Sequence, residues 1–433
     1  MPYGPQKSVM IRNYLDQFTK AIPMHEPGVG ELHKSNSEKY LGIVQTFYGT
    51  PTGIFCIIKR GTYANRRNGA IMFTRILVPL DGSTLAERAI PHAVHFARIF
   101  NSTIILLQVL DPISYHENPN PVDPLSWQIR KAEADMYMQN MTARTREYLQ
   151  TSINDDEISA NKDDKKIETN VEYAILEGKA AENIVDFTHR ENIDLLVIST
   201  HGASGLSRWN ISSVAQKVIN LIYIPVLIVR TYIQPATKDT RIHYRRILLP
   251  FDCSRRAECS LSAGILLTGG ETANKSETKG DNHSISPTIM AKSPSSSKLV
   301  LAAVIKPPEL PIPEPFPIEI EQLSQQLMKV SRQAVTNYLH EMQERLPVEC
   351  EFYVLEDKSV TSAIQKLARQ EEEIDLVVLC AHGSSGQFTW PYGSVASNYI
   401  EYGTKTVLIV QDVPRSKVQP TAAQIAAGKT GGR

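Results

Sequence analysis

An internal repeat constrains this chain more than any other feature of its sequence. Four segments recur in the same order: RILVPLDGS (75–83) as RILLPFDCS (246–254), IDLLVISTHGASG (193–205) as IDLVVLCAHGSSG (374–386), SSVA (212–215) as GSVA (393–396), and VLIV at both 226–229 and 407–410. A chain of 433 residues is too long for one ordinary domain. The repeat therefore indicates two copies of one folding unit.

Within each copy, short apolar runs alternate with stretches of helical periodicity. In the first copy we expect a strand at 76–80, a helix at 84–99, a strand at 103–110, a helix at 125–149, a strand at 168–176, a helix at 179–190, a strand at 195–199, a helix from about 212 to 221 and a strand at 226–229. Short apolar strands separated by helices are typical of a parallel sheet covered on both faces. The predicted fold class is α/β, with two doubly wound, Rossmann-like domains, each a five-stranded parallel sheet flanked by helices.

The repeat also predicts where the domains begin and end. We expect a first domain at 72–235 and a second at 241–413, called here the first and second repeat. The second contains an insertion at 269–297, whose Gly, Ser, Thr, Asn and Lys content predicts a flexible loop. Residues 1–71 match neither copy and are predicted to be an extension, disordered or an upstream read-through, and 414–433 a disordered tail.

Composition argues against several classes of function. Lysine plus arginine and aspartate plus glutamate each number 46, a balance that favours neither nucleic acid nor an anionic membrane as a partner. The most apolar stretch, 41–58, is interrupted by polar residues and proline, so no membrane span is expected. Five cysteines without a CxxC pair favour a reducing compartment, and we expect a cytoplasmic protein.

The repeated polar residues fall where a parallel sheet binds ligands, at the carboxyl ends of its strands. Asp81 and Asp252 end the first strand of each copy, and His-Gly pairs follow the fourth strand. A glycine loop that leads to a helix start can hold a phosphate through backbone N–H groups and the helix dipole. A carboxylate at the first strand's end can accept a hydrogen bond from an adenine amino group or a ribose hydroxyl.

These motifs resemble the universal stress protein family, in which the first strand ends in P-x-D and a later loop has the form G-x-x-G-x9-G-(S/T). The second copy departs from that loop at Cys380, and the first copy departs at Ser199 and Ser212. The resemblance implies an adenine nucleotide alpha hydrolase-like fold that binds ATP or AMP, with Mg²⁺ left open as a companion of ATP. Because the second copy is closer to the motif, its site is expected to be occupied more readily.

Carried over position by position, the resemblance implies two sets of nucleotide-binding residues. They are Pro79, Asp81, Val109, Ser199, His201, Gly202, Ser212, Ser213 and Val214 in the first copy, and Pro250, Asp252, Val304, Cys380, His382, Gly383, Gly393, Ser394 and Val395 in the second. In this family the last strand commonly mediates dimerisation, so the VLIV strands are expected to pair the repeats as an internal pseudo-dimer. A homodimer of the whole chain is left open.

Simpler interpretations stand beside each of these assignments. Asp81 and Asp252 could cap the following helix, and Ser213 and Ser394 could be helix caps. The His-Gly pairs are expected to shape a loop rather than to act in catalysis, since no nucleophile recurs near them. Val109 and Val304 could be ordinary core residues, and Cys380 a small buried one.

The leading function is a stress-response signalling or regulatory module that holds ATP or AMP. One alternative is a slow ATPase or nucleotide hydrolase, although the chain has no G-x-x-x-x-G-K-(S/T) loop and no repeated acidic pair for magnesium. Others are a nucleotide-independent interaction scaffold and a flavoprotein-like electron-transfer subunit of similar topology. No catalytic residue and no metal site is predicted.

Overall fold

The computed structural model describes residues 73–111, 124–151, 170–202, 211–231, 242–254, 256–269, 297–309, 316–371, 373–384 and 391–412. The predicted extension 1–71, the apolar stretch 41–58, the body of the insertion 269–297 and the tail 414–433 lie outside the described residues. The elements of the first repeat are β1 (Arg75–Leu80), α4 (Thr84–Glu87), α5 (Ala89–Phe100), β2 (Thr103–Leu110), α6 (Pro124–Thr151), β3 (Val171–Glu177), α7 (Ala180–Arg190), β4 (Leu195–Ser199), α8 (Ser213–Leu221) and β5 (Val226–Val229).

The second repeat follows the same plan, with one short 3-10 helix in place of α4. Its elements are β6 (Arg246–Phe251), η2 (Ala257–Ser260), α9 (Leu261–Leu267), β7 (Lys298–Ile305), α10 (Ile318–Arg345), β8 (Cys350–Glu356), α11 (Val360–Gln370), β9 (Ile374–Cys380), α12 (Ser394–Tyr402) and β10 (Thr406–Val410). The predicted α/β fold, a mainly parallel sheet with flanking helices in each repeat, is confirmed.

Hydrogen bonds join the described strands into one sheet of order β3-β2-β1-β4-β5-β10-β9-β6-β7-β8. Neighbours within a repeat are parallel, whereas β5 and β10 are antiparallel, with Leu227 opposite Leu408. The two VLIV segments therefore pair with each other, which removes two strand edges that would otherwise be open. In each repeat the strand order reverses once, between β1 and β4 and between β6 and β9.

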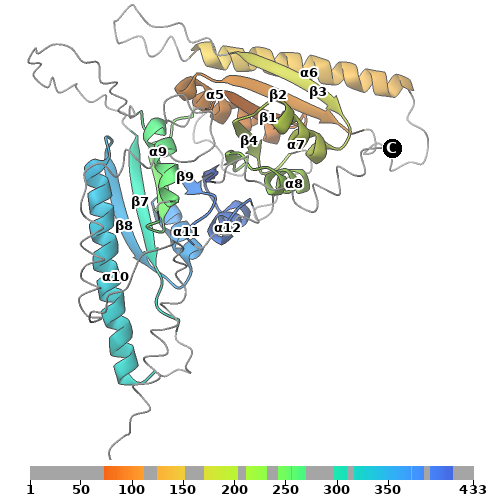
Figure 1. Ribbon diagram of the computed structural model, residues 1–433. Helices are drawn as coiled ribbons and strands as arrows, with labels where there is room; N and C mark the ends of the chain where they lie inside the picture. The colour runs from red at the N-terminus through yellow and green to blue at the C-terminus, as the bar shows by residue number, and fades with distance from the viewer. Residues whose placement is uncertain are drawn as a thin grey trace, which may run out of the picture. The chain divides into compact units, whose positions relative to one another are not determined.

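Both faces of the sheet are covered, because successive strand residues point to opposite sides. Ile76 and Val78 of β1 belong to one buried cluster, and Leu77 between them belongs to the other. The first cluster includes residues of α5, α6, α9 and α10, and the second includes residues of α7, α8, α11 and α12. In Figure 1, α6 runs along β3 and α10 runs along β8 as the longest helices of their repeats.

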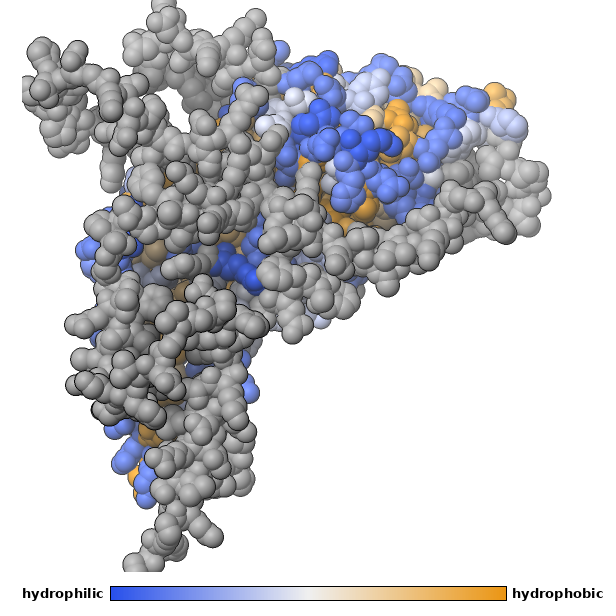
Figure 2. Space-filling model, viewed as in Figure 1, coloured by the Kyte–Doolittle hydropathy of each residue, from blue (hydrophilic) through white to orange (hydrophobic). Residues whose placement is uncertain are grey.

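Exposed apolar side chains gather on these two long helices. They are Leu125, Ile129 and Met136 of α6, and Ile318, Leu323, Leu327 and Val330 of α10. Elsewhere the described surface in view in Figure 2 is mainly hydrophilic, with smaller apolar areas between. Within the described part of the chain, no helix has both the length and the hydropathy needed to cross a membrane.

One predicted helix, 84–99, is interrupted in the structure. It divides at Arg88 into α4 and α5. Pro91 explains the break, since it has no N–H to donate to the carbonyl of Glu87 four residues earlier and is tolerated only in the first turn of α5. The Arg88 guanidinium also donates a hydrogen bond to the backbone oxygen of Thr231, beyond the end of β5.

Candidate functional site

Each aspartate at the end of the first strand organises the turn that follows it. Oδ1 of Asp81 accepts hydrogen bonds from the backbone N (3.0 Å) and Oγ (2.6 Å) of Ser83. Oδ1 of Asp252 accepts the same pair from Ser254, at 3.1 and 2.6 Å. The serine hydroxyls then accept from the N–H of Ala86 and Ala257, each at 3.2 Å. Ser83 is thus the N-cap of α4, and in both repeats the aspartate holds the serine in place.

The aspartates also lie against the glycine of the His-Gly pair. A Cβ added at Gly383 would stand 2.5 Å from Oδ2 of Asp252, and one added at Gly202 would overlap the Asp81 carboxylate. The backbone N of Ser384 donates to Oδ2 of Asp252 at 2.5 Å. A side chain at either position would have to displace the carboxylate, because the loop backbone passes directly beside it. The predicted aspartate and glycine therefore meet in both repeats.

Strand register places the second-strand valines level with the aspartates. Leu80, just before Asp81, pairs with Gln108, just before Val109. Phe251, just before Asp252, pairs with Ala303, just before Val304. Both valines are half-buried beside the core of their repeat. These side chains and the His-Gly pairs therefore share the carboxyl edge of the sheet, at the strand-order reversal where doubly wound folds bind ligands.

The loop after the fourth strand is closed in the same way in both repeats. The N–H of Ser212 donates to the carbonyl of Thr200, and the N–H of Gly393 donates to the carbonyl of Ala381, each at 2.7 Å. This bond brings the start of α8 or α12 back to the His-Gly pair. A Cβ at Gly393 would lie 3.4 Å from the oxygen of Ala381, within close contact but without overlap.

The two helix starts differ. Ser212 is the N-cap of α8, and its Oγ accepts from the N–H of Ala215 at 3.3 Å. Gly393 is the N-cap of α12 and has no side chain to accept an equivalent bond. Ser213 and Ser394, considered as caps above, are instead the first residues of their helices. The first turn of α12 therefore presents N–H groups that no N-cap side chain satisfies, which suits an anion.

His201 and His382 occupy equivalent positions in the two repeats but have different hydrogen-bond partners. Nδ1 of His201 lies 3.0 Å from Oγ1 of Thr200 and 3.3 Å from Oγ1 of Thr231. Nδ1 of His382 lies 2.6 Å from Oδ1 of Asp412, and both of these side chains are almost completely buried. Because a carboxylate only accepts, Nδ1 of His382 carries the hydrogen. The hydroxyls around His201 impose no such choice of tautomer.

Arg256 completes the second network. Its Nε lies 3.2 Å from Oδ2 of Asp412, and its Nη1 donates to the carbonyl of Gly383 at 3.3 Å. The first repeat has Leu85 at the position of Arg256 and Thr231 at that of Asp412. The ion pair of Arg256 with Asp412, and the contact of Asp412 with His382, thus belong to the second repeat.

The carboxylate of Asp252 is held in its ionised form. Partial desolvation acts to raise its pKa, but the hydrogen bonds from Ser254 and Ser384 outweigh that effect, so the pKa lies below its ordinary value. Asp252 thus presents a negatively charged acceptor at neutral pH, which suits a hydroxyl or amino donor.

The remaining predicted residues lie on the same edge or just inside it. Pro79 and Pro250 are in β1 and β6, Ser199 and Cys380 end β4 and β9, and Val214 and Val395 are the second residues of α8 and α12. Ser199 turns inward, and its Oγ donates to the carbonyl of His201 at 2.8 Å. Val214 is exposed and Val395 is half-buried. Among the residues described, no cluster of His, Cys, Asp and Glu could hold a metal ion.

Sequence reasoning missed Asp412 and Arg256. Both positions differ between the repeats, and a search for identical residues passes over such positions. A comparison of equivalent positions could have indicated the pair. Asp412 stands where the first repeat has Thr231, and Arg256 stands where it has Leu85, so two opposite charges occur in the second repeat alone.

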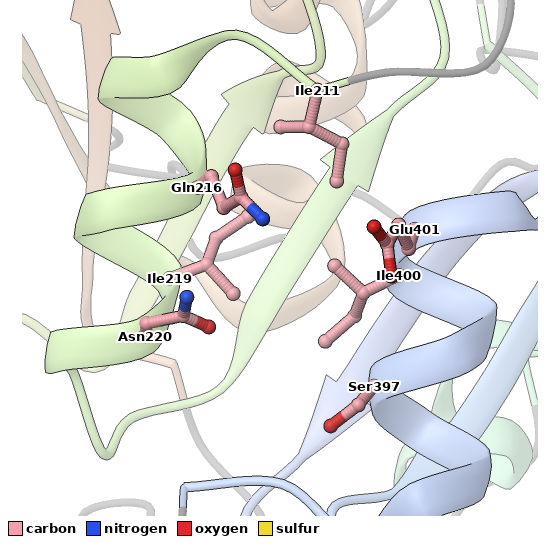
Figure 3. Close-up of a pocket in the computed structure, with 7 residues that line it drawn as sticks. All are labelled: Ile211, Gln216, Ile219, Asn220, Ser397, Ile400 and Glu401. Carbon is pink, nitrogen blue, oxygen red and sulfur yellow. The ribbon is translucent and has the colours of Figure 1, made fainter.

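A pocket of about 460 Å³ is lined by a different set of residues. Ile211, Gln216, Ile219 and Asn220 line it from the side of α8, and Ser397, Ile400 and Glu401 line it from α12 (Figure 3). None of the residues predicted to bind nucleotide is among them. The candidate site is therefore the carboxyl edge of the sheet and not this pocket.

In this α/β protein a strand-end aspartate, a glycine loop against it and a helix start beside that loop therefore meet at the carboxyl edge of the sheet. The model of the universal stress protein family matches residues 72–230 and 285–411. This chain belongs to the universal stress protein family. The second match begins after β6, although β6 pairs with β7 and β9 in the same sheet.

Individual relatives agree with this assignment. The chain is 29% identical over 164 residues to universal stress protein MJ0531 of Methanocaldococcus jannaschii, covering 38% of this chain and 86% of that protein. It is 25% identical over 161 residues to universal stress protein MJ0577 of the same organism, covering 37% and 97%. Membership of the family supports a role in the stress response.

Solved structures of the family were also matched. A universal stress protein from Archaeoglobus fulgidus aligns with a TM-score of 0.40 and 16% identity, over 78% of this chain and 98% of that one. A universal stress protein solved in complex with cAMP aligns with a TM-score of 0.26 and 20% identity, over 37% and 98%.

Proposed function

We propose that this protein binds an adenine nucleotide, ATP or AMP, at the carboxyl edge of the sheet, with the second repeat as the principal site. Bound nucleotide would set which partners the protein contacts during stress. In this proposal the protein is a regulatory module, and it acts in the cytoplasm. The observation that carries this proposal is the contact of Asp252 with the Gly383 loop, next to a helix start whose N-cap, Gly393, has no side chain.

Each residue of the second repeat has a role that its chemistry supports. Asp252, ionised and exposed, accepts a hydrogen bond from the ribose or the adenine amino group. Val304, level with it on β7, supplies an apolar contact for the base. Gly383, Gly393 and Ser394 bring backbone N–H groups and one hydroxyl to the phosphates. Where ATP is the ligand, Mg²⁺ would be held by its phosphates, since no acidic cluster is present among the described residues.

The His382–Asp412 pair invites comparison with a catalytic dyad, but its burial supports a different role. The side chains of His382 and Asp412 expose only 1% and 4% of their area. A general base has to come within hydrogen-bond reach of its substrate. We therefore assign the pair to shaping the loop and treat nucleotide binding, rather than hydrolysis, as the function.

The proposal is tested first by the small-molecule content of the purified full-length protein, released by denaturation and identified by mass spectrometry, and then by ATP and AMP titration. We expect adenine nucleotide to co-purify or to titrate, and Asp252→Ala to weaken binding by about tenfold, the loss expected for a charge-assisted hydrogen bond. Cys350→Ser, in β8, serves as the control that keeps binding. A well-folded protein that binds neither nucleotide would overturn the proposal and favour an interaction scaffold.

A further inference from the structure

Two cysteines that are distant in sequence meet beside the second site. Cys259 lies in η2, and Cys380 is the last residue of β9. Their Sγ atoms are 3.0 Å apart, with the Cys259 thiol donating to Cys380, although 121 residues separate them in the chain. Both are free thiols, and both residues are half-buried.

The pair is a feature of the second repeat alone. Arg88 occupies the position of Cys259 in the first repeat, and Ser199 occupies that of Cys380. There the two side chains bond to separate carbonyls, Arg88 to that of Thr231 and Ser199 to that of His201. Both repeats have the same fold, yet only the second has these two thiols. The fold therefore does not require the thiols.

We propose that Cys259 and Cys380 are a redox-active dithiol, which a peroxide oxidises reversibly to an intramolecular disulfide. In the first step the Cys380 thiolate attacks hydrogen peroxide, whose O–O bond breaks to give a Cys380 sulfenic acid and hydroxide. In the second step Cys259 sulfur attacks the Cys380 sulfur, and the sulfenic oxygen leaves as water with the proton of Cys259. The balance is two thiols and one peroxide giving one disulfide and two waters.

The geometry favours closure between these two residues. A disulfide needs an S–S distance of about 2.05 Å, so the two sulfur atoms have to approach by only about 1 Å. The other described cysteines are placed differently, Cys253 exposed in the turn after β6 and Cys350 buried in β8. Neither has a described hydrogen bond to another thiol, whereas Cys259 and Cys380 are already in contact.

The surroundings also assign the order of attack. The hydrogen bond to Cys380, followed by burial, raises the pKa of Cys259 well above its ordinary value. Cys259 therefore keeps its proton and donates it in a hydrogen bond to the sulfur of Cys380. Cys380 is accordingly the thiol that reacts with peroxide, and Cys259 is the one that resolves the sulfenic acid.

The disulfide would join the two segments that carry the second site. Cys380 directly precedes Ala381, His382 and Gly383, and η2 begins five residues after Asp252. A bond between them fixes η2 to β9, at the strand-order reversal of this repeat. The proposal concerns thiol chemistry and holds whether or not nucleotide binds there.

The test is peptide mapping of the full-length protein, treated with hydrogen peroxide and digested without reductant. We expect a Cys259–Cys380 cross-linked peptide, the loss of two free thiols per chain, and recovery of both with dithiothreitol. The closed loop is long, so oxidation should also raise the melting temperature by about 5 °C. Cys380→Ser, which copies Ser199 of the first repeat, should lose the cross-link and the temperature shift, whereas Cys253→Ser and Cys350→Ser should keep both.

Other outcomes would overturn the proposal. They are a cross-link that persists in Cys380→Ser, a disulfide that uses Cys253 or Cys350, or a wild-type protein that keeps all its thiols. Cys259→Ser gives a second variant for the same decision: without a resolving thiol, Cys380 should accumulate as sulfenic or sulfinic acid, and an unmodified Cys380 would count against the mechanism.

Discussion

The two repeats build the same backbone frame and then support it by different means. In both, the strand-end aspartate binds the serine two residues later on one side and lies against a glycine on the other. In the first repeat hydroxyl groups surround the buried histidine, whereas in the second Asp412 and Arg256 do so. The difference teaches that the fold fixes where the loop passes, and that the side chains around the loop decide how firmly it is held.

The helix starts teach the same lesson about ligand binding. Ser212 satisfies an N–H of α8 with its own hydroxyl, while Gly393 leaves the corresponding group of α12 without a side-chain acceptor. A serine at this position stabilises the helix and competes with an anionic ligand. We therefore expect the helix start of the first repeat to bind an anionic ligand less readily than that of the second.

The largest difference we expect between the repeats is in acid sensitivity. Burial, followed by neighbouring charge, lowers the pKa of His92 to about 3 and that of His95 to about 4. The second repeat has Ala263 and Leu266 at these positions. Because the unfolded chain binds protons below pH 6.5 and the folded histidines do not, the free energy of unfolding falls as the pH decreases through the window from 6.5 towards 4.

Denaturant unfolding at pH 8 and pH 5 measures this effect. The loss at pH 5 should reach up to about 2 kcal/mol for each histidine. His92→Gln, which keeps a polar partner for Tyr244, should weaken the dependence and leave the part due to His95, whereas His340→Gln on exposed α10 should leave it as it is. A wild-type stability that is unchanged between the two pH values would contradict the burial of these side chains.

Exchanging the histidine's partner should give the next largest effect. Asp412→Thr copies Thr231 and leaves Arg256 and His382 without their carboxylate, at a cost of about 3 kcal/mol in the free energy of unfolding. Thr231→Ala removes only a hydroxyl contact and should cost about 1 kcal/mol. Thermal or denaturant melts of the two variants make the comparison, and equal losses would show that the charged network adds nothing to the second repeat.

Exchanging the helix caps should give the smallest effect on stability and a graded effect on binding. Ser212→Gly costs only a few tenths of a kcal/mol, and it should strengthen nucleotide binding in the first repeat by a few fold. Gly393→Ser, at a position whose φ of −71° accepts any residue, should weaken binding in the second by a similar factor. Titration with a fluorescent adenine nucleotide measures both effects. Weaker binding in Ser212→Gly together with tighter binding in Gly393→Ser would refute the role given to the caps.

Much of the frame could be predicted from the sequence, because it depends on patterns that the repeat shows twice. The strands and the Asp-Gly meeting follow from periodicity and from motif order, whereas the VLIV pairing was expected from the resemblance to the family. The break at Arg88 was missed because helical spacing continues through it, and Pro91 was the signal to weigh. The Asp412 network and the Cys259–Cys380 contact were missed because each joins distant residues that occur in only one copy.

The most direct test of the account is the number of adenine nucleotide sites per chain, measured by isothermal titration calorimetry of the full-length protein with ATP. We predict one principal site, which Gly383→Val removes by placing a side chain against Asp252 and which the matched variant Gly202→Val retains. Circular dichroism serves as the check that both variants fold. Two sites of equal affinity, or a principal site lost only in Gly202→Val, would contradict the account.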